Sequence, residues 1–269
     1  MPAEGMGGQM KNVTIDESHR EELGTLIAYL INEDEKRAGQ AVPEDVAGRW
    51  ELFRELMITR PQLKATGEFV TPQNRFLSTL MFETDMTGLS DLEPVVELES
   101  GNIYLWEGDI VTLQIDAFVN PTTSDLLGYR DPNQDCIDND VHVLCGVQMR
   151  QSIVETLKAA PVEPGKSVIT MADNLMCAYI IHVPMLDTEN DENLAAHYQD
   201  IFELAETHGC RRLACPLLGA DNGVDADEAA KVAIDALKEG LSEAKILRNI
   251  VLVAKDAQEM AAYRSALGI

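Results

Sequence analysis

Short apolar runs alternate with helical segments through residues 101–269, and this alternation restricts the possible fold more than any other feature of the chain. The apolar runs predict strands over residues 103–106, 117–119, 167–171, 179–183, 212–215 and 250–254. The segments between them predict helices over residues 138–158, 193–208, 225–241 and 257–267. Such alternation is typical of a largely parallel sheet covered on both faces, so the sequence predicts an α/β domain.

Residues 1–83 show a different pattern from residues 101–269, because their apolar side chains recur only at helical spacing. The apolar stripe in residues 23–31 predicts one helix, and a second helix opens at Pro43 and ends before Pro61. A third helix is predicted to open at the capping residue Thr71, with Pro72 in its first turn. Three short helices bury little surface by themselves, so we expect them to dock on the α/β part. The expected organisation is therefore a small all-helical N-terminal region over 1–83, an acidic irregular linker over 84–100 and one domain over 101–269.

The charge of the chain excludes whole classes of partner. It has 21 Lys and Arg against 46 Asp and Glu, which gives a formal net charge of −25. A surface that neutralises nucleic-acid phosphates or binds anionic lipid needs the opposite balance, so we expect neither nucleic acid nor membrane as a partner. No apolar run approaches the roughly 20 residues of a membrane span, and residues 1–12 lack the apolar core of a signal peptide. Five cysteines are too few for a disulfide framework, which favours the reducing cytoplasm.

Ligands of such a sheet bind at the loops that leave the carboxyl ends of the strands. Taken alone, the residues of these loops leave alternatives open. Asp109 either accepts a hydrogen bond from an exocyclic amine such as that of adenine or lies in a solvated turn, and Asp138 either caps a helix or orients a water. Asn120 and Thr123 either bind sugar hydroxyls or form ordinary turns. Glycine in the loop 216–224 permits close approach of the backbone to a ligand.

Together these loops resemble the macrodomain, an ADP-ribose-binding α/β module. The resemblance rests on the order of Gly108-Asp109-Ile110, Val119-Asn120, Cys136-Ile137-Asp138-Asn139 with His142, and a glycine loop before an Ala-rich helix. The chain is most similar to bacterial zinc-containing macrodomains that act as protein-ADP-ribose hydrolases. Their helical N-terminal extension is similar to residues 49–57, followed by Arg60-Pro61, and to residues 68–73. The resemblance implies a three-layer fold with a mixed central sheet and helices on both faces.

The resemblance also implies roles for individual residues. Asp109 would bind the adenine amine, with the backbone N–H of Ile110 nearby, and Asn120 would begin the loop that lines the distal ribose. Asp138 matches the acidic residue beside the scissile ribose bond, and is the catalytic candidate. The other implied ligand-binding positions are Thr123, Asn139, Gly219, Ala220 and Asp221.

Several positions depart from the pattern of these relatives. The zinc ligands of the family fall on Tyr129, Gln134 and Cys136, and one thiolate does not hold Zn²⁺, which needs about three protein ligands. We therefore expect no zinc and no other cofactor. Thr123 replaces the last Asn of the ribose loop, and the hydroxyl-rich diphosphate loop has become 217–221, which ends in Asp221.

Three hypotheses remain open from the sequence. The first is an enzyme that hydrolyses an ADP-ribosyl bond on a modified protein, with Asp138 assisting a water. The second is a reader that binds ADP-ribose or a related nucleotide without turnover. The third is an interaction module whose ligand site has lapsed. The motif around Asp109 and that around Asp138 favour the first two, whereas Thr123 and the altered glycine loop favour the last two.

Overall fold

A seven-stranded mixed sheet forms the centre of the computed structural model, which describes residues 13–159, 163, 165–186 and 188–269. Its order is β1-β2-β7-β6-β3-β5-β4. The central strands β2, β7, β6, β3 and β5 run parallel, and β1 and β4 pair antiparallel at the two edges. The strands are β1 (Pro94–Leu98), β2 (Gly101–Glu107), β3 (Ala117–Thr122), β4 (Val168–Met171), β5 (Tyr179–Pro184), β6 (Arg212–Pro216) and β7 (Asn249–Ala254). The six strands predicted from the sequence are confirmed.

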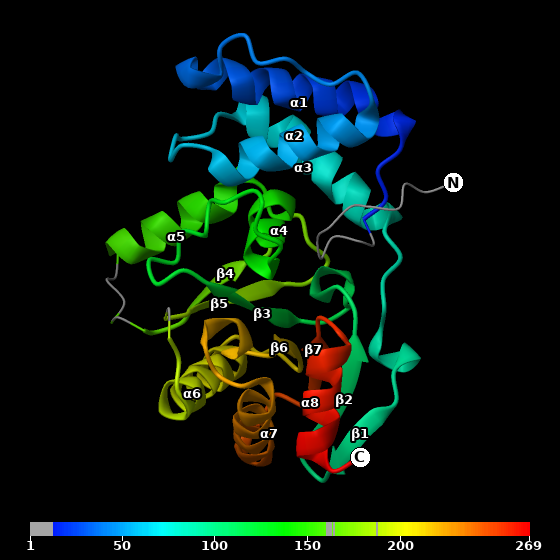
Figure 1. Ribbon diagram of the computed structural model, residues 1–269, viewed down its shortest axis with the longest axis vertical. Helices are drawn as coiled ribbons and strands as arrows, with labels where there is room; N and C mark the ends of the chain where they lie inside the picture. Colours follow the sequence, from blue (N-terminus) through cyan, green and yellow to red (C-terminus); the bar gives the residue numbers. More distant parts are fainter. Residues whose placement is uncertain (1–12, 160–162, 164, 187) are drawn as a thin grey trace.

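Helices cover both faces of this sheet, which gives three layers (Figure 1). One face carries α4 (Ile137–Leu144) and α5 (Val147–Ala159). The other carries α6 (Asp191–Thr207), α7 (Ala226–Glu243) and α8 (Ala257–Leu267). Each face has its own hydrophobic cluster, and the small side chains Ala229, Ala230 and Ala233 let α7 pack closely in the second. The predicted three-layer α/β fold is confirmed. No helix in the described part of the chain is long and apolar enough to cross a bilayer.

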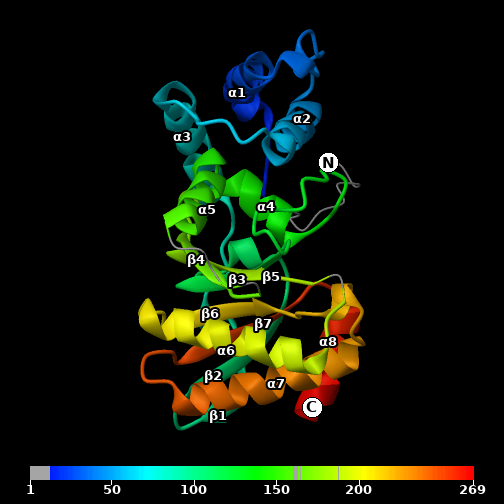
Figure 2. The same ribbon diagram turned by 90° about the vertical axis from the view of Figure 1, so that its left-hand side faces the viewer.

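The N-terminal helices lie over α4 and α5, on the side away from the sheet (Figure 2). They are α1 (Arg20–Glu33), α2 (Val46–Thr59) and α3 (Gly67–Glu83). Their apolar stripes belong to the same hydrophobic cluster as the buried side chains of α4, for example Phe53 and Phe76 with Val141 and Leu144. In addition, the side-chain oxygen of Gln73 accepts a hydrogen bond from the backbone N–H at the start of α5 (3.0 Å). The expected docking of these helices is therefore observed, while residues 1–12 lie outside the described residues.

Two predicted helix starts were misplaced. Helix α3 begins at Gly67, so the prediction that it opens at Thr71 is wrong, and Pro72 lies inside the helix. The earlier start follows from packing, because the buried ring of Phe69 stacks on Tyr29 of α1 with centroids 4.7 Å apart. Helix α2 begins after Pro43, and its first turn is capped by the Asp45 carboxylate, which accepts a hydrogen bond from the Gly48 N–H (2.8 Å).

The helix predicted over residues 138–158 is two helices. Gly146 separates them with φ +89°, a conformation that side chains rarely permit, and a Cβ there would collide with the side-chain amide of Gln73. The break lets α5 start under the N-terminal helices. A second correction concerns the segment 84–100, predicted to be irregular, which contains β1. This strand is a half-buried edge strand with a register shift between Pro94 and Val96, so its apolar pattern is short.

Candidate functional site

A cleft of about 470 Å³ opens at the carboxyl ends of β2, β3, β6 and β7. Its walls come from segments far apart in the sequence: Gly108 after β2, Pro121 in β3, Tyr129 and residues 134–137 up to the start of α4, residues 216–222 at the end of β6 and after it, and residues 253–259 from β7 into α8. Parallel strands bring their carboxyl ends to one edge, so the loops chosen from the sequence converge there.

Asp109 follows β2 and is buried beside this cleft. Its Oδ1 accepts a hydrogen bond from the Val111 N–H (3.2 Å) and caps the short turn that contains the buried Ile110. Its Oδ2 is buried and finds no donor within the described part of the chain. Burial is the main cause of a rise in the pKa of this carboxyl to about 7; the Val111 hydrogen bond acts against the rise, and the charge of Asp135 adds to it.

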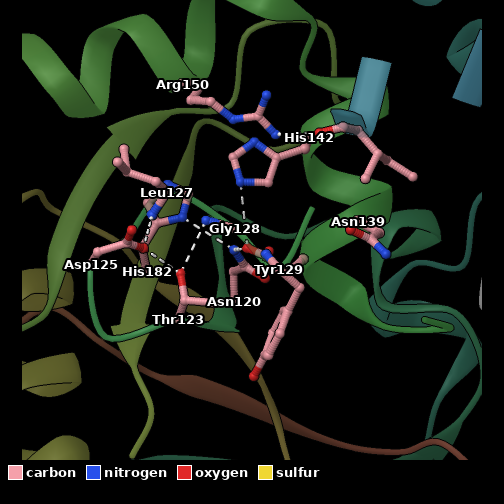
Figure 3. A network of polar contacts seen from close by, with 12 residues as sticks. Asn120, Thr123, Asp125, Leu127, Gly128, Tyr129, Asn139, His142, Arg150 and His182 are labelled. Carbon is pink, nitrogen blue, oxygen red and sulfur yellow. Dashed lines mark hydrogen bonds and ion pairs between the residues drawn. The ribbon is translucent and has the colours of Figure 1, made fainter. Parts of the chain in front are cut away.

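Asp138 lies in the first turn of α4 and is fully buried (0% exposed). Its Oδ1 accepts a hydrogen bond from the Asn120 side-chain amide (2.9 Å), and its Oδ2 accepts one from the Tyr129 N–H (3.1 Å). The His142 Nε2 lies 3.6 Å from Oδ1. The structure thus brings Asp138 and Asn120 together as predicted candidates, but neither lines the cleft. Tyr129 does line it, and its ring points away from His142 (Figure 3).

The network continues through two buried histidines that burial keeps neutral. The Asn120 amide lies 3.2 Å from His182 Nδ1, and His182 Nε2 lies 2.9 Å from the Thr170 hydroxyl. Burial and, to a smaller extent, the neighbouring His142 together lower the pKa of His182 to about 3. Burial also lowers the pKa of His142 well below its ordinary value, and it raises that of Asp138. Burial therefore disfavours the charged form of Asp138, His142 and His182 alike.

Two further predicted ligand residues shape the loops. The Thr123 hydroxyl donates a hydrogen bond to Asp125 (2.6 Å) and accepts one from the Gly128 N–H (3.1 Å), so it closes the turn after β3. The Asn139 side-chain amide donates to the carbonyls of Asp131 and Gln134 (2.8 and 2.7 Å). These bonds tie the loop before α4 to the helix itself. Neither Thr123 nor Asn139 lines the cleft.

The glycine loop after β6 does line the cleft. Gly219 adopts φ +89° and opens a short turn that includes the half-buried Ala220 and the exposed Asp221. The carboxylate of Asp221 is paired with the Lys255 ammonium at 2.5 Å, and Lys255 also lies 3.3 Å from Glu259. The acidic group expected beside a diphosphate is therefore partly neutralised by a lysine that the sequence analysis missed. Lys255 and Glu259 lie at the end of β7 and in α8, and no local motif marks them.

The donors at the zinc positions of related proteins do not fit that metal. Tyr129, Gln134 and Cys136 all line the cleft, but only Cys136 is a usual zinc ligand. Burial raises the pKa of its thiol to about 12, and the nearby carboxylates of Asp138 and Asp140 also raise it. Within the described ranges, no group of three or more His, Cys, Asp or Glu residues is placed to hold a metal ion.

Comparison with known proteins agrees with this architecture. The Macro domain family matches residues 119–233. The protein-ADP-ribose hydrolase of Staphylococcus aureus (strain COL) is 32% identical over 254 residues, which cover 89% of this chain and 94% of that protein. The protein-ADP-ribose hydrolase of Treponema medium is 31% identical over 251 residues, covering 90% and 96%. The chain belongs to the macrodomain family. Its similarity over about nine tenths of the chain is to proteins named protein-ADP-ribose hydrolase.

Solved structures show the same fold at lower identity. The Trypanosoma brucei macrodomain in complex with ADP-ribose has a TM-score of 0.62 and 19% identity, covering 80% of this chain and 95% of that one. The Oceanobacillus iheyensis macrodomain with ADP has a TM-score of 0.57 and 20% identity, covering 64% and 93%. These matches establish the common fold.

Proposed function

We propose that this chain binds ADP-ribose in the 470 Å³ cleft and removes it from modified proteins by hydrolysis. One observation carries the binding step. The buried acceptor Asp109 Oδ2, which follows the cleft-lining Gly108, has no donor within the described part of the chain. It belongs to the residue that the family resemblance assigns to the adenine amine. An adenine amine is the donor that this oxygen lacks, and an unpaired buried acceptor is costly.

The glycine loop would hold the diphosphate. Gly219 brings backbone close to the ligand, and Lys255 supplies a cation at the same wall. Lys255 is paired with Asp221. A bound diphosphate would therefore replace Asp221 as the anionic partner of the Lys255 ammonium. The walls also carry Asp135 and Glu259, which repel a dianion, so binding should strengthen as added salt screens them.

Hydrolysis depends on Asp138 in this proposal. Its two oxygens are held by Asn120 and by the backbone of Tyr129, so in this conformation it acts on the cleft by positioning Tyr129. A direct acid–base role requires the Tyr129 loop to open. The relatives are named protein-ADP-ribose hydrolase, which supports hydrolysis. The buried position of Asp138 instead favours the alternative, a reader that binds ADP-ribose without hydrolysing it.

One experiment separates these roles. ADP-ribose binding is measured by calorimetry, and release of ADP-ribose from a modified protein is measured for wild type, Asp138→Ala and Asp138→Asn. We expect Asp138→Ala to abolish release while binding stays within about tenfold, roughly 1.4 kcal/mol. If Asp138→Asn retains release, Asp138 positions the loop; if it loses release as Ala does, Asp138 acts as acid or base. Binding without release by wild type would establish the reader, and the absence of binding would refute the proposal.

The substrate in this proposal is an ADP-ribosylated protein in a bacterial-type cytoplasm. All five cysteines are free thiols, which fits a reducing compartment.

A further inference from the structure

A second cavity, of about 220 Å³, lies between the N-terminal helices and the α/β domain. It is bounded by the segment that follows α2 and by α5 with the end of α4, and it shares no lining residue with the cleft. One part of its wall is apolar and contains Met57, Leu63 and Val154. The cavity therefore combines an apolar wall with the charged groups described next.

Four basic side chains line this small space: Arg60, Lys64, Arg150 and Lys158. Glu155 is the one carboxylate among its lining residues, although acidic residues outnumber basic ones about two to one over the whole chain. Arg60 is already neutralised by Glu33 through two contacts of 2.5 and 2.7 Å. The remaining cations have no ion-pair partner within the described ranges.

Arg150 is the least compensated of these groups. Only 9% of its surface is exposed, its Nη2 donates to the Ile58 carbonyl at 3.3 Å, and its Nε has no partner within the described residues. Burial and the positive charges of Arg130 and Arg60 lower its pKa to about 10, and the charge of Asp138 partly offsets them. The guanidinium is still protonated at neutral pH. Buried charges in proteins are normally paired, and within the described residues Arg150 makes no ion pair with Asp138 or any other carboxylate.

We propose that this cavity binds a small organic carboxylate, whose apolar part contacts Met57, Leu63 and Val154 and whose carboxylate pairs with Arg150. The planar guanidinium matches a carboxylate with two parallel hydrogen bonds. Lys64 and Lys158 stand at the exposed side of the cavity and add charge. An apolar cavity of about 150 Å³ accepts benzene, so 220 Å³ accommodates roughly nine non-hydrogen atoms, the size of benzoate.

The test uses benzoate as the probe and benzamide as its uncharged counterpart of equal size, each titrated into the full chain by calorimetry. We expect one benzoate per chain with a dissociation constant of about 1 mM or lower, and benzamide at least about tenfold weaker. Equal binding of the two compounds, or no saturable benzoate binding, would overturn the proposal. Inorganic phosphate should also bind more weakly, because it has no group for the apolar wall; phosphate binding as tight as benzoate would refute the carboxylate assignment.

Matched variants locate the site. Lys64→Gln with Lys158→Gln should weaken benzoate about tenfold, since each removes a cation from the cavity. The control pair, Lys36→Gln with Lys231→Gln, changes the net charge equally at exposed positions elsewhere and should leave the affinity unchanged. Val154→Trp, which fills the apolar wall, should abolish binding. Equal weakening by both lysine pairs, or full binding by Val154→Trp, would show that benzoate binds elsewhere.

Discussion

If the proposed function is correct, the buried carboxyl of Asp109 should make ADP-ribose binding depend on pH near neutrality. Its pKa is raised to about 7 mainly by burial. The charged groups that interact with it are the carboxylates of Asp135 and Asp140, and Arg54 is paired with Asp140. Because Oδ1 accepts the Val111 N–H, the neutral carboxyl carries its proton on Oδ2, the oxygen proposed to accept from the adenine amine, so the ionised form is the one that binds. With this pKa about 9% of the protein is ionised at pH 6 and about 91% at pH 8, and the apparent affinity scales with that fraction. We therefore expect affinity to rise about tenfold from pH 6 to pH 8.

The assay is calorimetric titration with ADP-ribose at pH 6, 7 and 8 and constant ionic strength. Asp109→Asn is the matched variant, because an amide does not titrate and its profile therefore records the contribution of all other groups. Glu259, whose pKa burial also raises, is among those groups and works in the opposite direction. The ratio of the two profiles isolates Asp109. A wild-type profile parallel to that of Asp109→Asn, or one that falls relative to it as pH rises, would refute the reasoning.

The same shift affects stability with a defined sign. The folded-state pKa of Asp109 lies above its ordinary value of 3.8, so the folded state binds more protons than the unfolded state between about pH 4 and pH 7. This contribution to the free energy of unfolding is fully present below pH 4 and is lost as pH rises through 7. Denaturant titrations of wild type should therefore show a steeper loss of stability from pH 5 to pH 8 than those of Asp109→Asn.

Two other predictions concern the helical region and the metal. Arg54 lies 3.4 Å from the buried Asp140 and joins α2 to α4, so Arg54→Met should lower the free energy of unfolding by about 3 kcal/mol, because it leaves a buried carboxyl unpaired. Glu51→Gln, which removes its half-exposed second partner, should change that free energy by less than about 1 kcal/mol in the same denaturation assay, and equal losses would contradict the assignment. Elemental analysis of the purified chain should find well under one zinc per molecule; stoichiometric zinc that is lost in Cys136→Ala would show the metal prediction to be wrong.

Periodicity in the sequence was sufficient for most of the fold because the central strands are buried on both faces and the helices carry clear apolar stripes. It failed where the pattern is short or continuous. The edge strand β1 has only two consecutive apolar side chains, Val95 and Val96, and its last two residues, Glu97 and Leu98, are exposed. The helix break at Gly146 interrupts an unbroken helical pattern, and its cause is the approach of Gln73 from a helix far away in the sequence.

The candidate site was predictable as a set of loops and not as a set of contacts. Parallel strand order explains why Asp109, Asn120 and Gly219 gather near one edge of the sheet. Sequence patterns did not indicate that Asp138 is sealed below Tyr129, because that burial depends on a turn held by Thr123. The pairing of Asp221 with Lys255 joins residues 34 positions apart, and only tertiary packing sets it.

The two antiparallel edge strands also govern how molecules meet in solution. An exposed edge offers unpaired backbone groups to a strand of another molecule. Here β1 begins with Pro94, has an irregular register up to Val96 and then exposes the carboxylate of Glu97, while β4 is four residues long. Each device makes the edge a poor template for strand addition, and a net charge of −25 adds repulsion between molecules. These features should disfavour edge-to-edge association of the sheet between molecules at high concentration.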